Sequence, residues 1–148
     1  KDRGRAAGPC YDPCPMNEEK RKTPYDLVGG AAGVRRLVDA FYDRMDTLPE
    51  AYGIRKLHPA DLSGSREKLF MYLSGYLGGP NLFIEKFGHP RLRSRHLPFA
   101  IGAGERDQWL LCFRQAIDAT IENPALREAL WKPIAELADF MRNQPAAE

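Results

Sequence analysis

Apolar residues in this chain of 148 amino acids recur at intervals of three and four, which is the period of an amphipathic helix. Four stretches show this spacing: 31–47, 62–77, 105–121 and 125–142. In the first of them the apolar positions, expected to face the core, are Val34, Leu37, Val38, Phe41 and Met45. No stretch alternates apolar and polar residues over five positions, as a half-buried strand would. The pattern therefore predicts an all-α fold with four long helices.

Proline and glycine mark where these helices begin and end. Thr23 and Pro24 are suited to open a short first helix, which the glycine pair at 29–30 ends. The sequence Gly-Gly-Pro at 78–80 stops a later helix. Pro133 lies inside the last helical stretch, where it either kinks the helix or opens its main segment after a short leading turn.

Composition and charge predict one ordinary globular domain. The chain has 43% hydrophobic residues, but no apolar run approaches the ~20 residues of a membrane-spanning helix. Its 22 basic and 20 acidic residues leave a net charge of +2, which is too balanced to indicate nucleic acid or a membrane as the main partner. We expect residues 1–23 to form a flexible arm and residues 24–148 to form the domain.

The three cysteines are informative about the redox compartment of the protein rather than about a functional site. Their odd number and irregular spacing argue against a disulfide framework and favour a reducing compartment, so we expect a cytoplasmic protein. Cys112 lies in a helical pattern and is expected to be a small buried apolar residue. Cys10 and Cys14 lie in a polar stretch, where we expect two loosely ordered thiols; a labile disulfide or a redox role is the alternative.

The stretch GHPRLRSRHLPFAIG, residues 88–102, combines rigidity with charge between helical segments. Within it, a neutral His96 on a stiff segment has the properties of an axial ligand for an iron porphyrin. Nearby arginines are suitable donors to the two porphyrin propionates. The residues alone leave two alternatives open: a basic surface loop with a partly buried histidine, or a patch that binds phosphate or nucleic acid.

The order of several motifs extends this interpretation to the whole chain from about residue 24 to 143. YDLVGG, AFYDRM, LHPADLSGSREKL and YLGGP are followed by the stretch 88–102 and then by ERDQWL. In this order the chain resembles the truncated haemoglobins, specifically the second group of that family. The resemblance implies a two-over-two α-helical sandwich around haem b (iron protoporphyrin IX).

The resemblance also implies the residues on the distal side of the haem, where a gas ligand binds. Tyr42 of AFYDRM matches the tyrosine whose hydroxyl donates to the ligand, and Trp109 of ERDQW matches a tryptophan whose indole N–H points into the same space. His58 falls where relatives carry phenylalanine, tyrosine or histidine. Without the resemblance, Tyr42 reads as a core-edge tyrosine, Trp109 as packing and His58 as a solvated loop residue.

On the proximal side the resemblance makes His96 the iron ligand. Lys68 and Arg95 match positions that pair with propionates, and Arg93 is a further candidate. His89 is expected to be structural and to bond the backbone of its own turn. The remaining side chains expected against the haem are Leu69, Leu73, Tyr76 and Phe99.

These residues predict a protein that binds dioxygen, nitric oxide or carbon monoxide. Two or three buried donors at ~1 to 1.5 kcal/mol each would slow oxygen release by one to three orders of magnitude. Such retention favours chemistry over transport, and the resemblance implies nitric oxide dioxygenase or peroxidase-like activity with an external reductase. The alternatives are oxygen storage or transport, a gas or redox sensor, and a haem-free helical interaction module. We expect a monomer or a weak homodimer.

Overall fold

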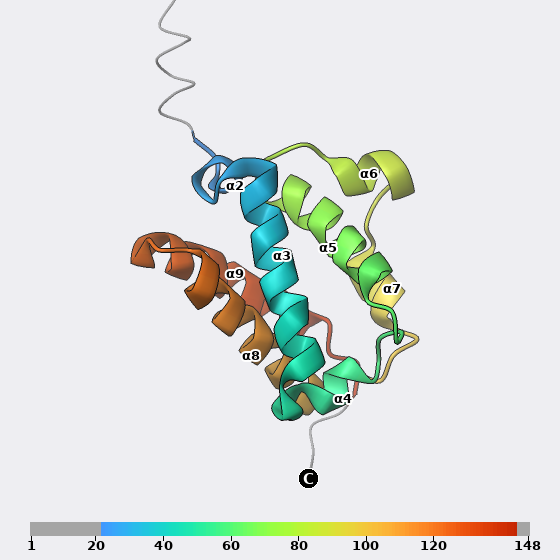
Figure 1. Ribbon diagram of the computed structural model, residues 1–148. Coiled ribbons are helices and arrows are strands. Elements are labelled where there is room, and N and C mark those ends of the chain that lie inside the picture. Colours follow the sequence, from blue (N-terminus) through green and yellow to red (C-terminus); the bar gives the residue numbers. More distant parts are fainter. Residues whose placement is uncertain (1–21, 145–148) are drawn as a thin grey trace, which may run out of the picture.

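The computed structural model describes residues 22–144, and this part of the chain forms helices and no strands (Figure 1). The all-α prediction is confirmed, and the four long predicted helices correspond to α3, α5, α8 and α9. The elements, in chain order, are α2 (Pro24–Leu27), α3 (Gly30–Thr47), the 3-10 turn η2 (Pro49–Ala51), α4 (Tyr52–Arg55), α5 (Ser63–Tyr76), α6 (Leu82–Phe87), α7 (Leu92–His96), α8 (Ala103–Thr120) and α9 (Pro124–Phe140).

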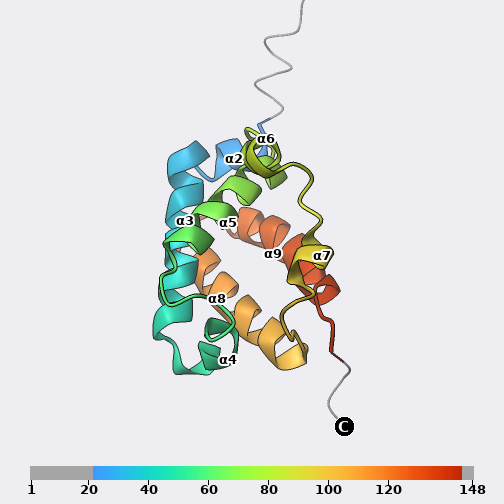
Figure 2. The same cartoon turned by 90° about the vertical axis from the view of Figure 1, so that its right-hand side faces the viewer.

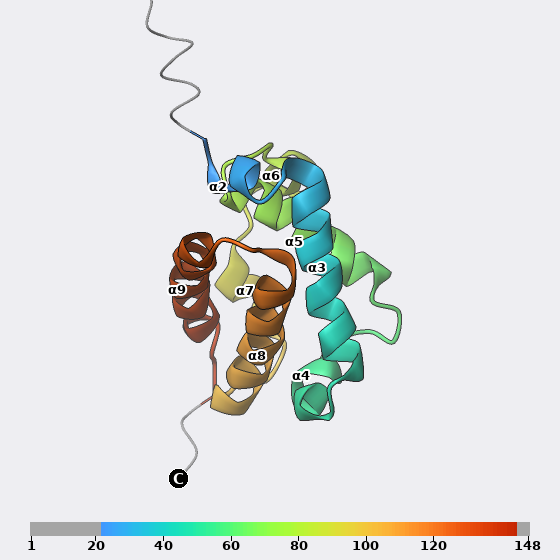
Figure 3. The ribbon, with the colours of Figure 1, turned by 60° about the vertical axis from the view of Figure 1, so that its left-hand side comes forward.

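The long helices form two antiparallel pairs, α3 with α5 and α8 with α9. α3 also packs extensively along α8 and so joins the two pairs (Figures 1 and 3). The short helices α6 and α7 follow α5, and α7 lies beside the C-terminal end of α9 (Figure 2). The result is a two-over-two sandwich with α6 and α7 along one side.

Local capping signals explain where the helices begin. The Thr23 hydroxyl accepts a hydrogen bond from the Asp26 N–H, which confirms Thr23 as the cap of α2, and the Asp26 carboxylate accepts one from the Thr23 N–H, which completes a capping box. The Asn123 side chain caps α9 in the same position. Pro133 lies inside α9, which begins at Pro124, so Pro133 does not open a separate segment.

The core lies where α3 crosses α8. Phe41 is fully buried and contacts an aromatic ring of α8, Phe113, at 5.9 Å between centroids. Cys112 is also fully buried, as expected, and burial raises the pKa of its thiol to about 11. The other fully buried large side chains of α3 and α8 are Val34, Leu37, Val38, Met45 and Ile117.

The sequence analysis missed α6 and α7. Both are short, and the glycines and prolines around 88–102 obscure their periodicity. Arg91 begins α7 with a φ of 46°, a left-handed conformation that a non-glycine residue seldom adopts. Cys10, Cys14 and nearly all of the predicted arm lie outside the described residues, and no helix within 22–144 is long and apolar enough to cross a membrane.

Candidate functional site

Tyr42 lies on α3 next to His58, with an edge-to-face arrangement and 5.9 Å between ring centroids. Its side chain is only 5% exposed, and burial raises its pKa, so the hydroxyl keeps its proton. Among residues 22–144 no side chain or backbone group hydrogen-bonds this hydroxyl. Tyr42 therefore has a buried ring and a hydroxyl whose proton is not used within the described part of the protein.

Trp109 on α8 belongs to the same aromatic group. Its ring lies 4.8 Å from Phe41 and stacks on Phe113 at 5.2 Å. The Phe41 ring also lies 4.8 Å from the Tyr42 ring, so one buried ring contacts both predicted donors. The sequence pattern identified Phe41 as a core residue but not as this link.

The protonation state of His58 follows from its hydrogen bond. Its Nδ1 lies 2.9 Å from the Ile54 carbonyl oxygen, which can only accept, so Nδ1 carries the proton and Nε2 has a lone pair. Burial lowers the pKa of His58, the hydrogen bond to the Ile54 carbonyl offsets part of this shift, and the positive charge of Arg55 lowers the pKa further. Neutral His58 thus offers an acceptor at Nε2, which leaves Tyr42 and Trp109 as the donors at neutral pH.

Two polar side chains that the sequence analysis missed hold the bend carrying His58. The Gln108 Oε1 accepts from the Ile54 N–H at 2.7 Å, which ties α4 to α8 next to Trp109. Arg55 donates to the Asp46 carboxylate at 2.9 Å and also to the carbonyls of Pro59 and Ala60. Neither role has a signal in the sequence, because each partner lies on another element.

His96 ends α7 and is half-buried. Its Nδ1 lies 2.6 Å from the Leu92 carbonyl oxygen, so Nδ1 carries the proton and the Nε2 lone pair is available to a metal. His89 accepts a hydrogen bond from the Arg91 N–H at 3.1 Å, which is the backbone bond expected for a structural histidine. Between the two histidines of this stretch, only His96 presents the arrangement of an iron ligand.

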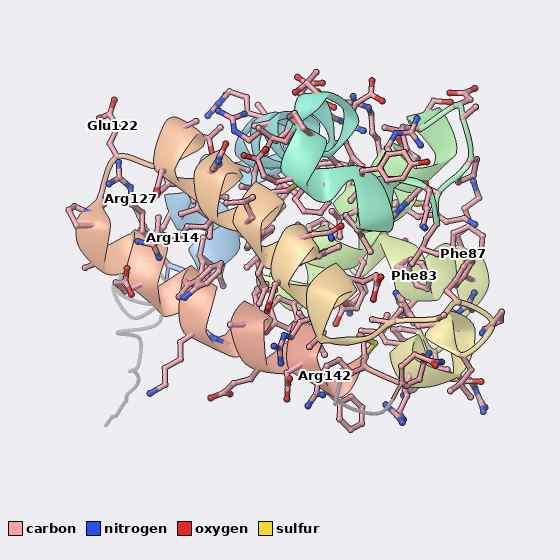
Figure 4. All side chains as sticks on the ribbon, turned by 90° about the horizontal axis from the view of Figure 1, so that it is seen from below. Phe83, Phe87, Arg114, Glu122, Arg127 and Arg142 are labelled. Carbon is pink, nitrogen blue, oxygen red and sulfur yellow. The ribbon has the colours of Figure 1, made fainter. Side chains whose placement is uncertain are left out.

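The three basic residues expected at the haem propionates differ from one another in the groups that they contact. Arg95 donates to the Pro90 carbonyl and lies over the Phe83 ring, while the Lys68 ammonium lies 5.9 Å from the Phe87 ring centroid. Both rings belong to α6, on the side of the protein shown in Figure 4. Arg93 instead donates to two backbone carbonyls at the end of α9.

The apolar residues expected at the haem differ in burial. Leu73 is buried in the core, Leu69 is half-buried, and Tyr76 and Phe99 are exposed. Tyr76 stacks on Tyr72, and both line a cavity of about 170 Å³. The other residues lining this cavity are Met71, Gly75, Asn81, Phe83, Ile84 and Pro90.

These residues fit a haem group. Most of the large exposed apolar side chains belong to the segment between the end of α5 and the start of α8, so this segment carries much of the apolar surface that a bulky apolar group needs. No group of three or more histidine, cysteine or acidic side chains within 22–144 is arranged to hold a bare metal ion. Porphyrin supplies four ligands itself, so one imidazole with a free Nε2, such as that of His96, is sufficient for iron. The exposed side chains in this region are Tyr76, Ile84, Phe87, Leu97 and Phe99.

Comparison with known proteins identifies the family. A family model described as bacterial-like globin matches residues 23–143. The chain is 38% identical over 125 residues to the group 2 truncated haemoglobin YjbI of Bacillus subtilis, and the match covers 84% of this chain and 92% of that protein. The chain belongs to the group II truncated haemoglobins.

Solved structures of this family share its fold. The group II 2-on-2 haemoglobin of Agrobacterium tumefaciens is 56% identical with a TM-score of 0.84, covering 85% of this chain and 98% of that chain. The oxygen-avid truncated haemoglobin of Bacillus subtilis is 37% identical with a TM-score of 0.75, covering 82% and 100%. Membership of the truncated haemoglobins implies a haem cofactor, as the resemblance predicted.

Proposed function

We propose that this truncated haemoglobin binds haem b with His96 as the proximal ligand of a five-coordinate iron. The observation that carries the proposal is the pair of free groups in the site: the Nε2 lone pair of His96 and the unused hydroxyl of Tyr42 within the described residues. The apolar side chains around α6 and α7 would cover the porphyrin, with Lys68 and Arg95 as partners for its propionates.

When bound, haem supplies an iron centre that takes dioxygen, nitric oxide or carbon monoxide. Tyr42 and Trp109 donate hydrogen bonds to such a ligand from a site of low dielectric, where each is stronger than in water. Burial keeps the Tyr42 hydroxyl protonated, so its donation persists across the physiological pH range. Two such donors would slow ligand release by about ten- to a hundredfold.

A gas ligand that leaves slowly favours chemistry over delivery. We infer that the protein works in the cytoplasm and removes nitric oxide or peroxide, with an external reductase returning the iron to its ferrous state. The oxygen-avid relative from Bacillus subtilis supports strong retention of oxygen in this family. Oxygen storage or gas sensing is the second candidate, because the same donors would also serve a protein that completes no catalytic cycle.

Nitric oxide consumption over many turnovers distinguishes these two functions. The oxygen-bound protein is mixed, in air-saturated buffer, with a chemical reductant and with nitric oxide that is in excess over the protein but not over dissolved dioxygen, and nitrate is measured against the amount of protein. We expect nitrate to exceed the protein many times over. A single burst equal to the protein concentration would contradict the enzymatic function and favour storage or sensing.

A further inference from the structure

The helix that carries His96 has little packing of its own. α7 has five residues, none of them buried, and within residues 22–144 it forms no extensive contact with another helix. Its N-cap residue, Arg91, has a left-handed conformation, which costs a non-glycine residue free energy and needs the surrounding structure to hold it. The hydrogen bond to the Leu92 carbonyl holds the His96 ring within α7, so hydrogen bonds from elsewhere must fix the position of α7 itself.

One set of bonds runs from α7 to the end of α9. A single terminal nitrogen of the Arg93 guanidinium donates to the carbonyls of Phe140 at 2.7 Å and Arg142 at 2.8 Å. The guanidinium also lies 5.5 Å from the Phe140 ring centroid. The last carbonyls of a helix lack partners within it, so a charged donor at this place satisfies groups that would otherwise need water.

A second set of bonds comes from Asn143, just beyond α9. Its Nδ2 donates to the carbonyls of His96 at 3.2 Å and Phe99 at 2.8 Å, and its Oδ1 accepts from the Ile101 N–H at 2.9 Å. The Asn143 N–H donates in turn to the Ile101 carbonyl at 2.8 Å. One side chain thus spans the whole connection from the proximal histidine to the start of α8.

We propose that Arg93 and Asn143 form a C-terminal clamp that positions His96 for the iron. The proposal rests on the proposed function, because it takes His96 as the ligand. It also assigns Arg93 a role away from the propionates: a positioning residue that acts through α7. Loss of the clamp should let α7 move. The His96 Nε2 would then take a wider range of positions relative to the iron, the bond between them would weaken, and haem would be released faster.

The test uses the full-length haem protein with substitutions at two positions, Asn143 and Arg93. Asn143→Asp keeps the size and the Oδ1 acceptor for Ile101 but loses the donor to His96 and Phe99. Arg93→Ala removes both bonds to α9, while Arg93→Lys restores a cationic donor. The matched control is Arg127→Ala, since Arg127 also donates to helix-end carbonyls, those of Ile121 and Asp118, at the opposite end of α9 from Arg142 (Figure 4).

Two readouts separate positioning from general stability: the iron–histidine stretching band in resonance Raman spectra of the ferrous protein, and the rate of haem transfer to excess apomyoglobin. Asn143→Asp and Arg93→Ala should shift or broaden the band and release haem about tenfold faster. Arg93→Lys should recover much of the loss. Arg127→Ala should leave both readouts as in the wild type. Unchanged values in Asn143→Asp and Arg93→Ala, or an equal change in Arg127→Ala, would overturn the clamp.

A His96→Gly background tells failure of the clamp apart from failure of the proposed function. Free imidazole that fills the vacated place is not attached to α7, so Asn143→Asp on this background should no longer alter the band. An effect that persists there would overturn positioning through His96. A wild-type band that survives His96→Gly without imidazole would instead refute His96 as the ligand, and the clamp with it.

Discussion

The two sides of the proposed haem site are built by different means. Tyr42 and Trp109 extend from long helices and pack around Phe41, in the core where α3 crosses α8. His96 ends a helix of five residues with no buried side chain, and hydrogen bonds from distant residues hold it. The distal side is thus fixed by packing and the proximal side by a polar tether, which predicts that mutations on the two sides will differ in kind.

The largest expected effect of a mutation is a loss of folding stability on the packed side of the site. Phe41→Ala removes a fully buried ring that touches Tyr42, Trp109 and Phe113, and should lower the free energy of unfolding by about 3–5 kcal/mol. The matched control is Phe140→Ala, where the ring is 60% exposed and the loss should be about 1 kcal/mol or less. Urea unfolding measures both. Similar losses would show that the distal side does not depend on packing.

A smaller effect is expected at the polar bond that supports His58. Gln108→Ala leaves the Ile54 N–H without its acceptor and should cost about 1–2 kcal/mol in urea unfolding. Gln108→Glu retains an oxygen at this place and should stay close to the wild type. If both variants are equally destabilised, the hydrogen bond to α4 is not the cause.

Removal of the Tyr42 hydroxyl should change ligand release and leave stability nearly unchanged. Tyr42→Phe is expected to speed oxygen dissociation about five- to tenfold, since one donor is lost while Trp109 remains. Stopped-flow measurement of oxygen displacement gives the rate. Tyr52→Phe, at a ring 70% exposed on α4, is the control and should keep the wild-type rate. An unchanged rate in Tyr42→Phe would show that Tyr42 is not a direct donor.

The smallest expected effect is on the pH dependence of folding stability. Burial lowers the pKa of His58, so in the haem-free protein the unfolded state takes up this proton first as the pH falls, and stability declines below the ordinary histidine pKa of ~6.5. His58→Phe removes this contribution. Urea midpoints at pH 7.5 and pH 5.5 should therefore differ less in His58→Phe than in the wild type. A larger pH dependence in the variant would contradict a buried, neutral His58.

The sequence predicted the packed side better than the tethered side, and the reason is physical. Helical periodicity reports burial directly, so α3 and α8 were predicted together with Phe41 and Cys112 as core residues. The partners of Arg93 and Asn143 lie more than forty positions away along the chain. Single hydrogen bonds between distant elements leave no periodic pattern, and α7 is too short to show one.

The central claim is that His96, rather than His58, holds the iron. Titration of haem into the haem-free wild type, His96→Ala and His58→Ala, followed at the Soret band, tests it most directly. The account predicts that His96→Ala loses tight one-to-one binding, while His58→Ala binds haem as the wild type does. Tight binding with an unchanged ferrous spectrum in His96→Ala, or its loss in His58→Ala alone, would contradict the account.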